Sequence, residues 1–489
     1  MLAGLPESQR RAAPSAEVGS TEAVERGVSE KQPIHGTTLR ERTAKAAADK
    51  RLQASLRRAA DTFAERTASA HAAFSDGEEL RRLARSIKAD ILRRLPDVLA
   101  RLADRVQARG GSVCWAHTAA EANQYVADVA KRIGAKSAVK SKSMASEEIG
   151  LNQALEAEGC QVTETDLGEW IIQLANEMPS HIIVPAIHRD RGQIAEVLSR
   201  VAGGDLSDVP EDLAAFARER LRAKFLAADL GISGVNFGIA ETGTCVLVTN
   251  EGNGRLVTSL PRVHVAIMGM ERVLDSWEQL DLFLALLPRA ATGQAITTYT
   301  SFINGTRAAD EVDGPDEFHL VILDNGRSEI LGSDVSEMLA CIRCGACLNV
   351  CPVYRQIGGH AYGWVYSGPM GAVLTPLLAD AKEAAELSQA STLCGACWQA
   401  CPVGIPLQDL LLALRRRSAS DAGRIERAGW RAWAAAWSRP AAYRASLRAG
   451  GAVRGLASMG VGFGGWSAGR ELPELPKQAF RELWEKGKV

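Results

Sequence analysis

Residues 341–352 read CIRCGACLNVCP, and this stretch decides how the second half of the chain folds. Its spacing is C-x2-C-x2-C-x3-C-P, which is typical of a [4Fe-4S] cluster. Two-residue spacings let three thiolates of one tight loop reach three corners of a cube, and the proline directs the fourth thiolate elsewhere. The motif comprises Cys341, Cys344, Cys347, Cys351 and Pro352.

In two-cluster proteins of this type the fourth cysteine ligates the other cluster, so a second motif is expected. CGACWQACP over residues 394–402 supplies it. Crossed ligation gives cluster 1 the ligands Cys341, Cys344, Cys347 and Cys401. It gives cluster 2 the ligands Cys351, Cys394 and Cys397, which is one thiolate short of a full set.

The missing cysteine falls three residues before Cys394, where the chain has Ser391. The fourth ligand is then a serine oxygen, water or an outside group, or the centre is [3Fe-4S]. Zinc is the main alternative, because C-x2-C pairs also occur in zinc ribbons. A tetrahedral zinc site does not need a third cysteine followed by x3-C-P. The spacing therefore favours two iron-sulfur clusters and, with them, one-electron transfer.

Composition and charge exclude several classes of protein. The 489 residues are 46% hydrophobic and carry 57 Lys and Arg against 58 Asp and Glu, which excludes a nucleic-acid binder defined by bulk charge. No run approaches the roughly 20 apolar residues of a membrane-spanning helix. The first residues lack the apolar segment of a signal peptide, so we expect a cytoplasmic protein whose clustered cysteines bind metal.

The order of apolar runs predicts five segments. Strands alternate with helices over residues 110–328, which predicts an α/β domain whose largely parallel sheet is covered on both faces, with some antiparallel pairing near 235–248. Segments expected to be strands include 112–116, 137–141, 160–164 and 180–186. The other segments are a disordered tail (1–36), N-terminal helices (37–109, two helices), a mainly helical two-cluster domain (329–410) and a C-terminal extension (411–489).

The C-terminal extension is basic and rich in tryptophan. Residues 411–489 contain 15 Lys and Arg against 6 Asp and Glu, a net charge of +9. Trp430, Trp433 and Trp437 fall on one face of an expected helix. This pattern suits docking on anionic lipid or on an acidic partner subunit, and it equally suits packing on the cluster domain.

Two segments of the α/β domain are candidate pocket walls. VKSKSMASEEI (139–149) places Lys140 and Lys142 before a helix start, which suits an anion, although an exposed basic turn with a serine cap fits as well. GIAETGTCVLVTNEGNGR (238–255) places polar groups at both ends of an apolar strand. Glu241 and Lys142 are the candidate catalytic residues, and turn or ion-pair roles are the alternative.

Four stretches together resemble the lactate utilization protein B family: KSKSMASEEIGLNQALE, AETGTCVLVTNEGNGRLVTSLPRVHVA, CIRCGACLNVCPVY and LCGACWQACPVGIPL. The resemblance covers residues 40–489 and includes the absence of an eighth cluster cysteine. It implies a LUD domain, similar in fold to sugar-phosphate isomerases and CoA-transferases.

The same resemblance implies an electron-transfer role in oxidising L-lactate to pyruvate, rather than the subunit that does the chemistry. It also implies two partner subunits, a cysteine-rich iron-sulfur protein and a smaller LUD protein. Two alternatives are kept: the LUD domain is itself an enzyme on an anionic substrate with regulatory clusters, or the clusters are purely structural.

Overall fold

The computed structural model describes residues 37–379, 384–420, 423–452, 478 and 480–488. The chain forms two compact units that divide between Arg415 and Arg416. The predicted tail over residues 1–36 lies outside the described residues, as does much of the C-terminal extension.

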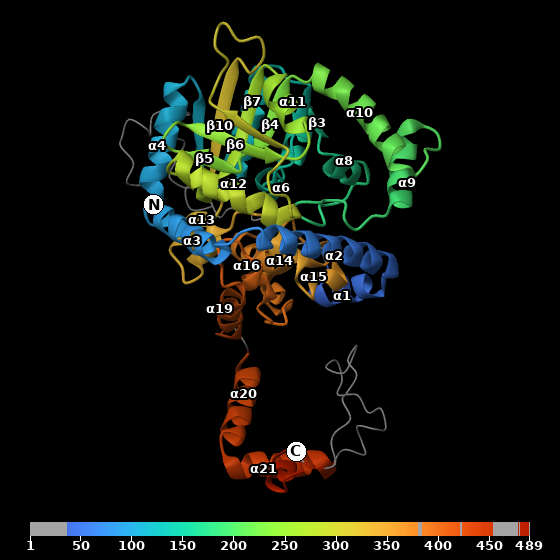
Figure 1. The fold of residues 1–489 in the computed structure, drawn as a ribbon, viewed down its shortest axis with the longest axis vertical. Helices are drawn as coiled ribbons and strands as arrows, with labels where there is room; N and C mark the ends of the chain where they lie inside the picture. The colour runs from blue at the N-terminus through green and yellow to red at the C-terminus, as the bar shows by residue number, and fades with distance from the viewer. Residues whose placement is uncertain (1–36, 380–383, 421–422, 453–477, 479, 489) are drawn as a thin grey trace, which may run out of the picture. The chain divides into compact units, whose positions relative to one another are not determined.

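A six-stranded parallel sheet forms the centre of the larger unit (Figure 1). Its strand order is β1-β10-β7-β4-β2-β3, and every neighbouring pair is parallel. The strands are β1 (Ser112–Ala116), β2 (Ser137–Lys140), β3 (Gln161–Glu164), β4 (Leu230–Gly234), β7 (Val263–Gly269) and β10 (Glu317–Leu323). The predicted α/β fold with a parallel sheet is confirmed.

Both faces of this sheet are buried, as the apolar strands predict. On β7, Val265 and Ile267 belong to one core cluster, and the alternating residues Ala266 and Met268 belong to another. The surrounding helices are α4 (Leu95–Ala108), α5 (Ala119–Arg132), α6 (Met144–Glu148), α7 (Leu151–Ala157), α8 (Leu167–Leu174), α9 (Arg191–Ala202), α10 (Pro210–Ala227), α11 (Asn253–Ser259) and α12 (Trp277–Thr292).

A smaller four-stranded sheet has the order β8-β5-β6-β9. Strand β5 (Phe237–Ile239) pairs antiparallel with β6 (Thr244–Thr249), where the sequence predicts antiparallel pairing. Strand β6 also pairs antiparallel with β9 (Tyr299–Ile303), and β5 pairs parallel with β8 (Val273–Leu274).

The strand predicted over residues 180–186 is wrong, because this segment is a loop held against the cluster domain. The backbone N–H groups of Ile183 and Val184 donate to His181 Nδ1, and Ser180 O accepts the hydroxyl of Tyr354 at 2.8 Å. Its polar backbone groups are thus satisfied without a sheet.

The two helices predicted before the α/β domain are in fact four. They are α1 (Leu39–Ala48), α2 (Lys50–Ala72), α3 (Gly77–Arg93) and α4. Asp49 interrupts the first pair and accepts the N–H of Leu52, which makes it the N-cap of α2. Pro96 stands at the start of α4, where its missing N–H costs no helical hydrogen bond.

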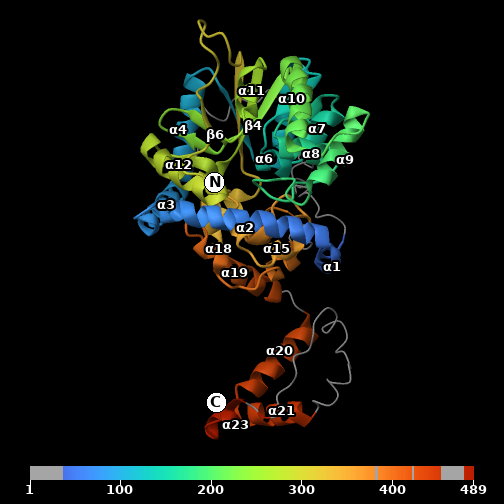
Figure 2. The ribbon, with the colours of Figure 1, turned by 45° about the vertical axis from the view of Figure 1, so that its right-hand side comes forward.

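The cysteine motifs lie in a domain of short helices, as predicted. Its elements are α13 (Arg327–Leu331), η5 (Ser336–Ala340), α14 (Ala346–Asn349), α15 (Tyr354–Ile357), η6 (His360–Tyr362), α16 (Gly368–Leu378), η7 (Ala385–Gln389), α18 (Ala396–Gln399) and α19 (Leu407–Ser420). Helix α2 contacts α12 of the α/β domain and also α14 and α15 (Figures 1 and 2). It therefore joins the two domains within the larger unit.

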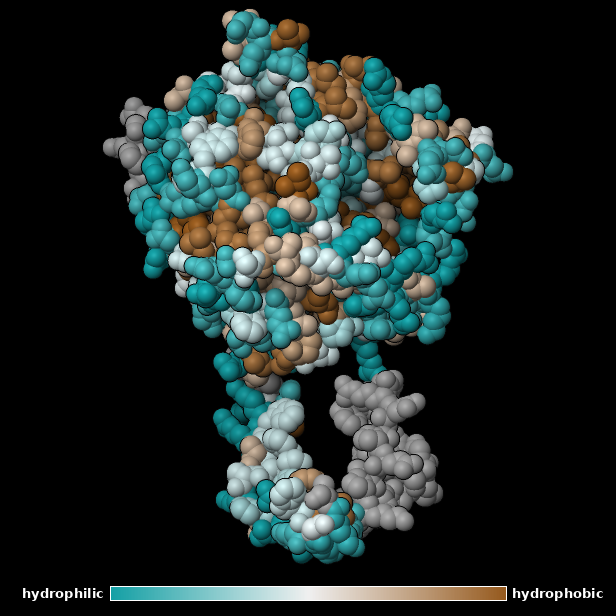
Figure 3. Space-filling model, viewed as in Figure 1, coloured by the Kyte–Doolittle hydropathy of each residue, from teal (hydrophilic) through white to brown (hydrophobic). Residues whose placement is uncertain are grey.

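The smaller unit contains α20 (Arg424–Trp437), α21 (Pro440–Ala452) and α23 (Phe480–Glu485). Trp433 lies between Trp430 and Trp437, with ring centroids 5.8 and 4.9 Å away, so the three share one face as predicted. Among the described residues, no helix has both the length and the apolar composition to cross a membrane. The face in Figure 3 mixes hydrophilic and apolar side chains, as globular surfaces do.

Candidate functional site

Four of the seven motif cysteines line one small cavity. Cys341, Cys344 and Cys347 come from the first motif, and Cys401 comes from the second. The rest of the lining is mainly apolar and includes Ile182, Met338, Met370, Val403 and Ile405. The fold thus brings together the four cysteines that crossed ligation assigns to cluster 1.

The other three cysteines form a second group nearer the surface. Burial, together with the neighbouring Cys351 and Cys394, raises the pKa of Cys397 to about 11. Cys351 and Cys397 are buried, whereas Cys394 is exposed. Helices α14 and α18, which carry Cys347 and Cys397, contact each other.

The two motifs share a backbone conformation. Arg343 and Leu393 each precede the sequence CGAC and have φ values of 59° and 56°, in the left-handed region that non-glycine residues rarely adopt. The glycines that follow, Gly345 and Gly395, also have positive φ and begin α14 and α18. Each motif therefore turns sharply into a short helix that carries its next cysteine.

Backbone N–H groups point at several thiol sulfurs. Arg343 donates to Cys341 Sγ at 3.4 Å, Tyr354 to Cys351 Sγ at 3.5 Å, and Ile405 to Cys401 Sγ at 3.4 Å. Burial raises the pKa of the Cys401 thiol to about 11, and a bound metal centre would reverse this by deprotonating the thiol. Such N–H···S contacts tune iron-sulfur clusters, so the donor set fits this cofactor.

Ser391, the residue at the missing cysteine position, is half-buried on the second motif's loop. Its Oγ accepts the backbone N–H of Leu393 at 3.1 Å, and its carbonyl oxygen accepts from Arg415 at 2.9 Å. The identity of the fourth ligand of cluster 2 stays a prediction with the alternatives given above.

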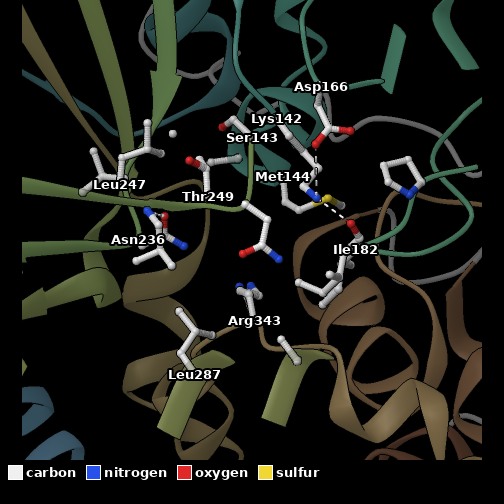
Figure 4. Close-up of a pocket in the computed structure, with 18 of the residues that line it drawn as sticks. Lys142, Ser143, Met144, Asp166, Ile182, Asn236, Leu247, Thr249, Leu287 and Arg343 are labelled. Atoms are coloured by element: carbon white, nitrogen blue, oxygen red, sulfur yellow. Dashed lines mark hydrogen bonds and ion pairs between the residues drawn. The ribbon is translucent and has the colours of Figure 1, made fainter. Parts of the chain in front are cut away.

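Figure 4 shows a second pocket, of about 470 Å³. It adjoins the first cysteine group, because Ile182 and Arg343 line both cavities. It lies where β2, β4 and β7 end, and ligands of open parallel sheets bind at the carboxyl ends of strands. Its lining contains residues of both predicted wall segments, including Lys142 and Ser143 from the first and Thr249 and Asn250 from the second. The two segments thus contribute to one pocket.

The candidate residues of the first segment separate in the structure. Lys142 lines the pocket, and its Nζ donates to Ile183 O at 2.6 Å and lies 3.8 Å from Asp166 Oδ2. Lys140 is instead buried among carboxylates, so only one ammonium group faces the pocket. Ser143 caps α6, where its Oγ accepts the N–H of Ser146.

Glu241, the other candidate catalytic residue, is exposed and is not among the residues that line this pocket. Sequence reasoning missed a charged cluster at the pocket's other end, formed by Glu271, Arg272, Arg327, Arg343 and Tyr366. Two features of the sequence could have indicated this cluster: the charged pair in MER (270–272), directly after an apolar strand, and Arg343 inside the first cysteine motif.

Three family models match successive regions of the chain from residue 99 onward. A LUD domain matches residues 99–323, a 4Fe-4S dicluster domain matches 337–405, and the C-terminal domain of lactate utilisation protein B matches 413–489. Lactate utilization protein B from Bacillus pumilus is 45% identical over 464 residues, which cover 93% of this chain and 98% of the relative. The chain belongs to the lactate utilization protein B family.

Other members of the lactate utilization protein B family match similarly. The Oceanobacillus iheyensis protein is 48% identical over 420 residues, 83% of this chain and 87% of the relative. The Macrococcus caseolyticus protein is 53% identical over 359 residues, 73% and 75% of the two chains. A solved DUF162 family protein from Deinococcus radiodurans covers 47% of this chain and 98% of its own, with 14% identity and a TM-score of 0.27.

This member of the lactate utilization protein B family also has a buried carboxylate cluster around Lys140. Its Nζ lies 2.6 Å from Glu147 and 2.8 Å from Glu164, and oxygens of Glu147, Glu164 and Glu169 lie within 4.8 Å of one another. Burial raises the pKa of Glu164 to about 7, and burial and the neighbouring carboxylates raise the pKa of Glu169. The cluster therefore holds protons in the folded state.

Replacing Glu164 with glutamine should flatten the pH dependence of stability. Glu164 binds its proton more tightly in the folded protein than in the unfolded chain, because its pKa is about 7 when folded against a reference value of 4.5. Protonation of Glu164 therefore stabilises the folded state most below pH 4.5, and this contribution is lost as the pH rises through 7. Urea unfolding between pH 5 and 8 measures the effect, with Glu211→Gln on an exposed helix as the control. Equal pH slopes for Glu164→Gln and the parent protein would contradict the buried-proton assignment.

Proposed function

We propose that this chain is the iron-sulfur electron-transfer subunit of a system that oxidises L-lactate to pyruvate and so allows lactate to serve as a carbon source. The relatives named lactate utilization protein B and the dicluster domain support this proposal. The observation that carries it is the difference in burial between the two cysteine groups. The first group is largely buried beside the pocket, whereas the second includes the exposed Cys394, where an electron could pass to a partner.

Oxidation of L-lactate to pyruvate releases two electrons and two protons, from the hydroxyl group and from C2. Two iron-sulfur clusters, each taking one electron at a time, supply one-electron transfer when bound. In this proposal the two-electron step takes place on a partner subunit, the protons go to solvent, and the electrons pass singly to a one-electron acceptor. The seven motif cysteines would hold the clusters as thiolates. Backbone N–H groups donate to Sγ of Cys341, Cys351 and Cys401.

The predicted segments have separate roles in this function. The LUD domain occupies residues 110–328, the cluster domain 329–410 and the basic extension 411–489. Two partner subunits complete the system, a cysteine-rich iron-sulfur protein and a smaller LUD protein. The extension, with its exposed Trp430, Trp433 and Trp437, is a surface for one of these partners or for anionic lipid.

Deletion of this chain's gene tests the proposal in cells. We expect growth on L-lactate as carbon source to be lost, growth on pyruvate to be kept, and the plasmid-borne chain to restore growth on lactate. The pyruvate medium controls for general damage to metabolism. Normal growth of the deletion strain on L-lactate would contradict the proposed function.

The pocket supports a second candidate, in which the LUD domain itself acts on an anionic substrate and the clusters are regulatory or structural. Under this alternative, Lys142→Met would abolish turnover while both clusters stay intact, because Lys142 lines the pocket. Unchanged turnover in this variant would reject it. Clusters that never change oxidation state during turnover would favour it over electron transfer.

A further inference from the structure

Ile182 and Arg343 line both the cysteine cavity and the adjoining pocket, and only Arg343 carries a charge. Arg343 lies between Cys341 and Cys344 in the first motif, and its backbone N–H donates to Cys341 Sγ. Its guanidinium group reaches into the pocket (Figure 4). There Nη2 lies 3.1 Å from Glu271 Oε1. A ligand that touched this side chain would therefore contact the cluster motif itself.

The fold of the loop does not require an arginine at this position. Leu393 takes the same place before CGAC in the second motif and has nearly the same φ, 56° against 59°. An uncharged side chain thus satisfies the same backbone turn. A buried charge needs partners, so the guanidinium of Arg343 must interact with groups outside the loop.

Arg343 has hydrogen-bonding capacity to spare. Its side chain is only 12% exposed, and no atom of the described residues accepts a hydrogen bond from the buried Nη1. The buried Asn253 Oδ1, also from a pocket-lining residue, has no donor among the described residues. Native proteins rarely leave such groups unsatisfied, so both atoms indicate a ligand with polar groups.

Charge at this end of the pocket favours an anion. Three guanidinium groups, those of Arg272, Arg327 and Arg343, line it. Two carboxylates oppose them: Glu148 pairs with Arg327 at 2.7 Å, and Glu271 pairs with Arg327 at 2.8 Å and with Arg343 at 3.1 Å. One positive charge remains uncompensated within this set, and a guanidinium binds a carboxylate well because its donors match the two oxygens.

The rest of the pocket suits an organic molecule. Apolar side chains such as Met144, Ile182, Leu247 and Leu287 form much of the lining, and Asn236 and Thr249 add uncharged polar groups (Figure 4). A volume of about 470 Å³ is typical of small-molecule sites. At the opposite end Lys142 is already engaged by Ile183 O and Asp166. Arg272 donates to Cys341 O, whereas Nη1 of Arg343 has no acceptor among the described residues, so we take Arg343 as the anchor for a carboxylate.

We propose that this pocket binds an organic carboxylate of the 2-hydroxy or 2-oxo acid class, with its carboxylate on Arg343. The choice of acid class rests on the proposed function, whereas the carboxylate and its anchor rest on the pocket alone. Arg343 is a binding residue here, and it couples occupancy of the pocket to cluster 1 because its N–H group donates to the sulfur of a cluster cysteine.

Pyruvate is the probe, because it cannot donate the electrons that lactate does. Calorimetry on the oxygen-free holoprotein should show binding, and Arg343→Gln should weaken it by about tenfold to a hundredfold, as expected for loss of a charged hydrogen bond. Arg343→Lys should retain part of the affinity. The matched control is Arg355→Gln, because Arg355 pairs with Asp61 in the same larger unit but does not line the pocket.

A second readout follows the cluster itself. Pyruvate should shift the electron paramagnetic resonance signal of reduced cluster 1 in the parent protein and in Arg355→Gln, and should not shift it in Arg343→Gln. Thr249→Phe fills the pocket from β6 without touching a cysteine loop, so it should abolish both binding and shift with the iron content unchanged. If Arg343→Gln fails to assemble its clusters, Thr249→Phe still tests whether pyruvate binds in this pocket.

Three results would overturn the inference: equal pyruvate affinity in the parent protein, Arg343→Gln and Thr249→Phe; no binding of pyruvate or L-lactate; or inorganic phosphate binding as tightly as pyruvate. If lactate and the partners still reduce the clusters when pyruvate does not bind, this inference alone fails. If pyruvate binds but lactate never reduces the clusters, the proposed function fails and the site remains.

Discussion

Cys344→Ser should remove cluster 1 and with it lactate-dependent electron transfer. Cys344 is buried in the cavity that it shares with Cys341, Cys347 and Cys401, so its replacement leaves three of the four thiols that line this cavity. We expect about four irons fewer per chain, loss of growth on L-lactate, and an intact α/β domain. Iron analysis, growth and circular dichroism measure these three effects.

Cys114→Ser is the matched control for this variant. Cys114 lies on β1, outside both cysteine groups, and is half-buried. Its replacement should leave the iron content and growth on lactate unchanged. Full iron content or normal growth in Cys344→Ser would contradict the ligand assignment.

Arg327→Ala should cause the largest loss of stability among single replacements outside the cysteines. Arg327 is fully buried; it donates to both oxygens of Glu148 at 2.8 and 2.7 Å and to Glu271 at 2.8 Å. Tyr366 of the cluster domain also donates to Glu148 at 2.7 Å. Removing the guanidinium takes three charged hydrogen bonds away from two buried carboxylates, which costs about 3 to 5 kcal/mol of unfolding free energy.

Urea unfolding of the oxygen-free holoprotein measures this loss. The control is Arg93→Ala, because Arg93 is 75% exposed and pairs with Asp90 on the surface, where ion pairs contribute little. Arg327→Ala should therefore lower the urea midpoint far more than Arg93→Ala. Equal midpoints for the two variants would show that the buried network does not stabilise the junction of the two domains.

Much of the fold could be predicted because it depends on local patterns. Buried parallel strands such as VHVAIM are continuous apolar runs, and the cysteine spacing identifies the cluster domain directly. Strand β4 was missed because LGISG contains two glycines. A Cβ at Gly231 would lie 2.1 Å from Val257 O, so close packing of α11 demands a residue that disfavours strands.

The pocket was harder to predict because it is assembled from distant segments. Lys140 and Lys142 are two residues apart, yet one ends a strand and binds buried carboxylates while the other turns toward the pocket. SHIIVPA has the composition of a strand, but contacts with the cluster domain hold it as a loop. The positions of the two lysines and the loop conformation of SHIIVPA both depend on packing between distant segments, so local sequence spacing does not predict them.

The central claim is that this chain carries two iron-sulfur clusters that lactate reduces through its partners. Iron and acid-labile sulfide per chain, measured on protein purified without oxygen, test it most directly when combined with electron paramagnetic resonance before and after L-lactate and the partner subunits are added. The account predicts about eight irons, or seven if cluster 2 is [3Fe-4S], and signals that lactate changes. Zinc in place of iron, or clusters indifferent to lactate and the partners, would contradict it.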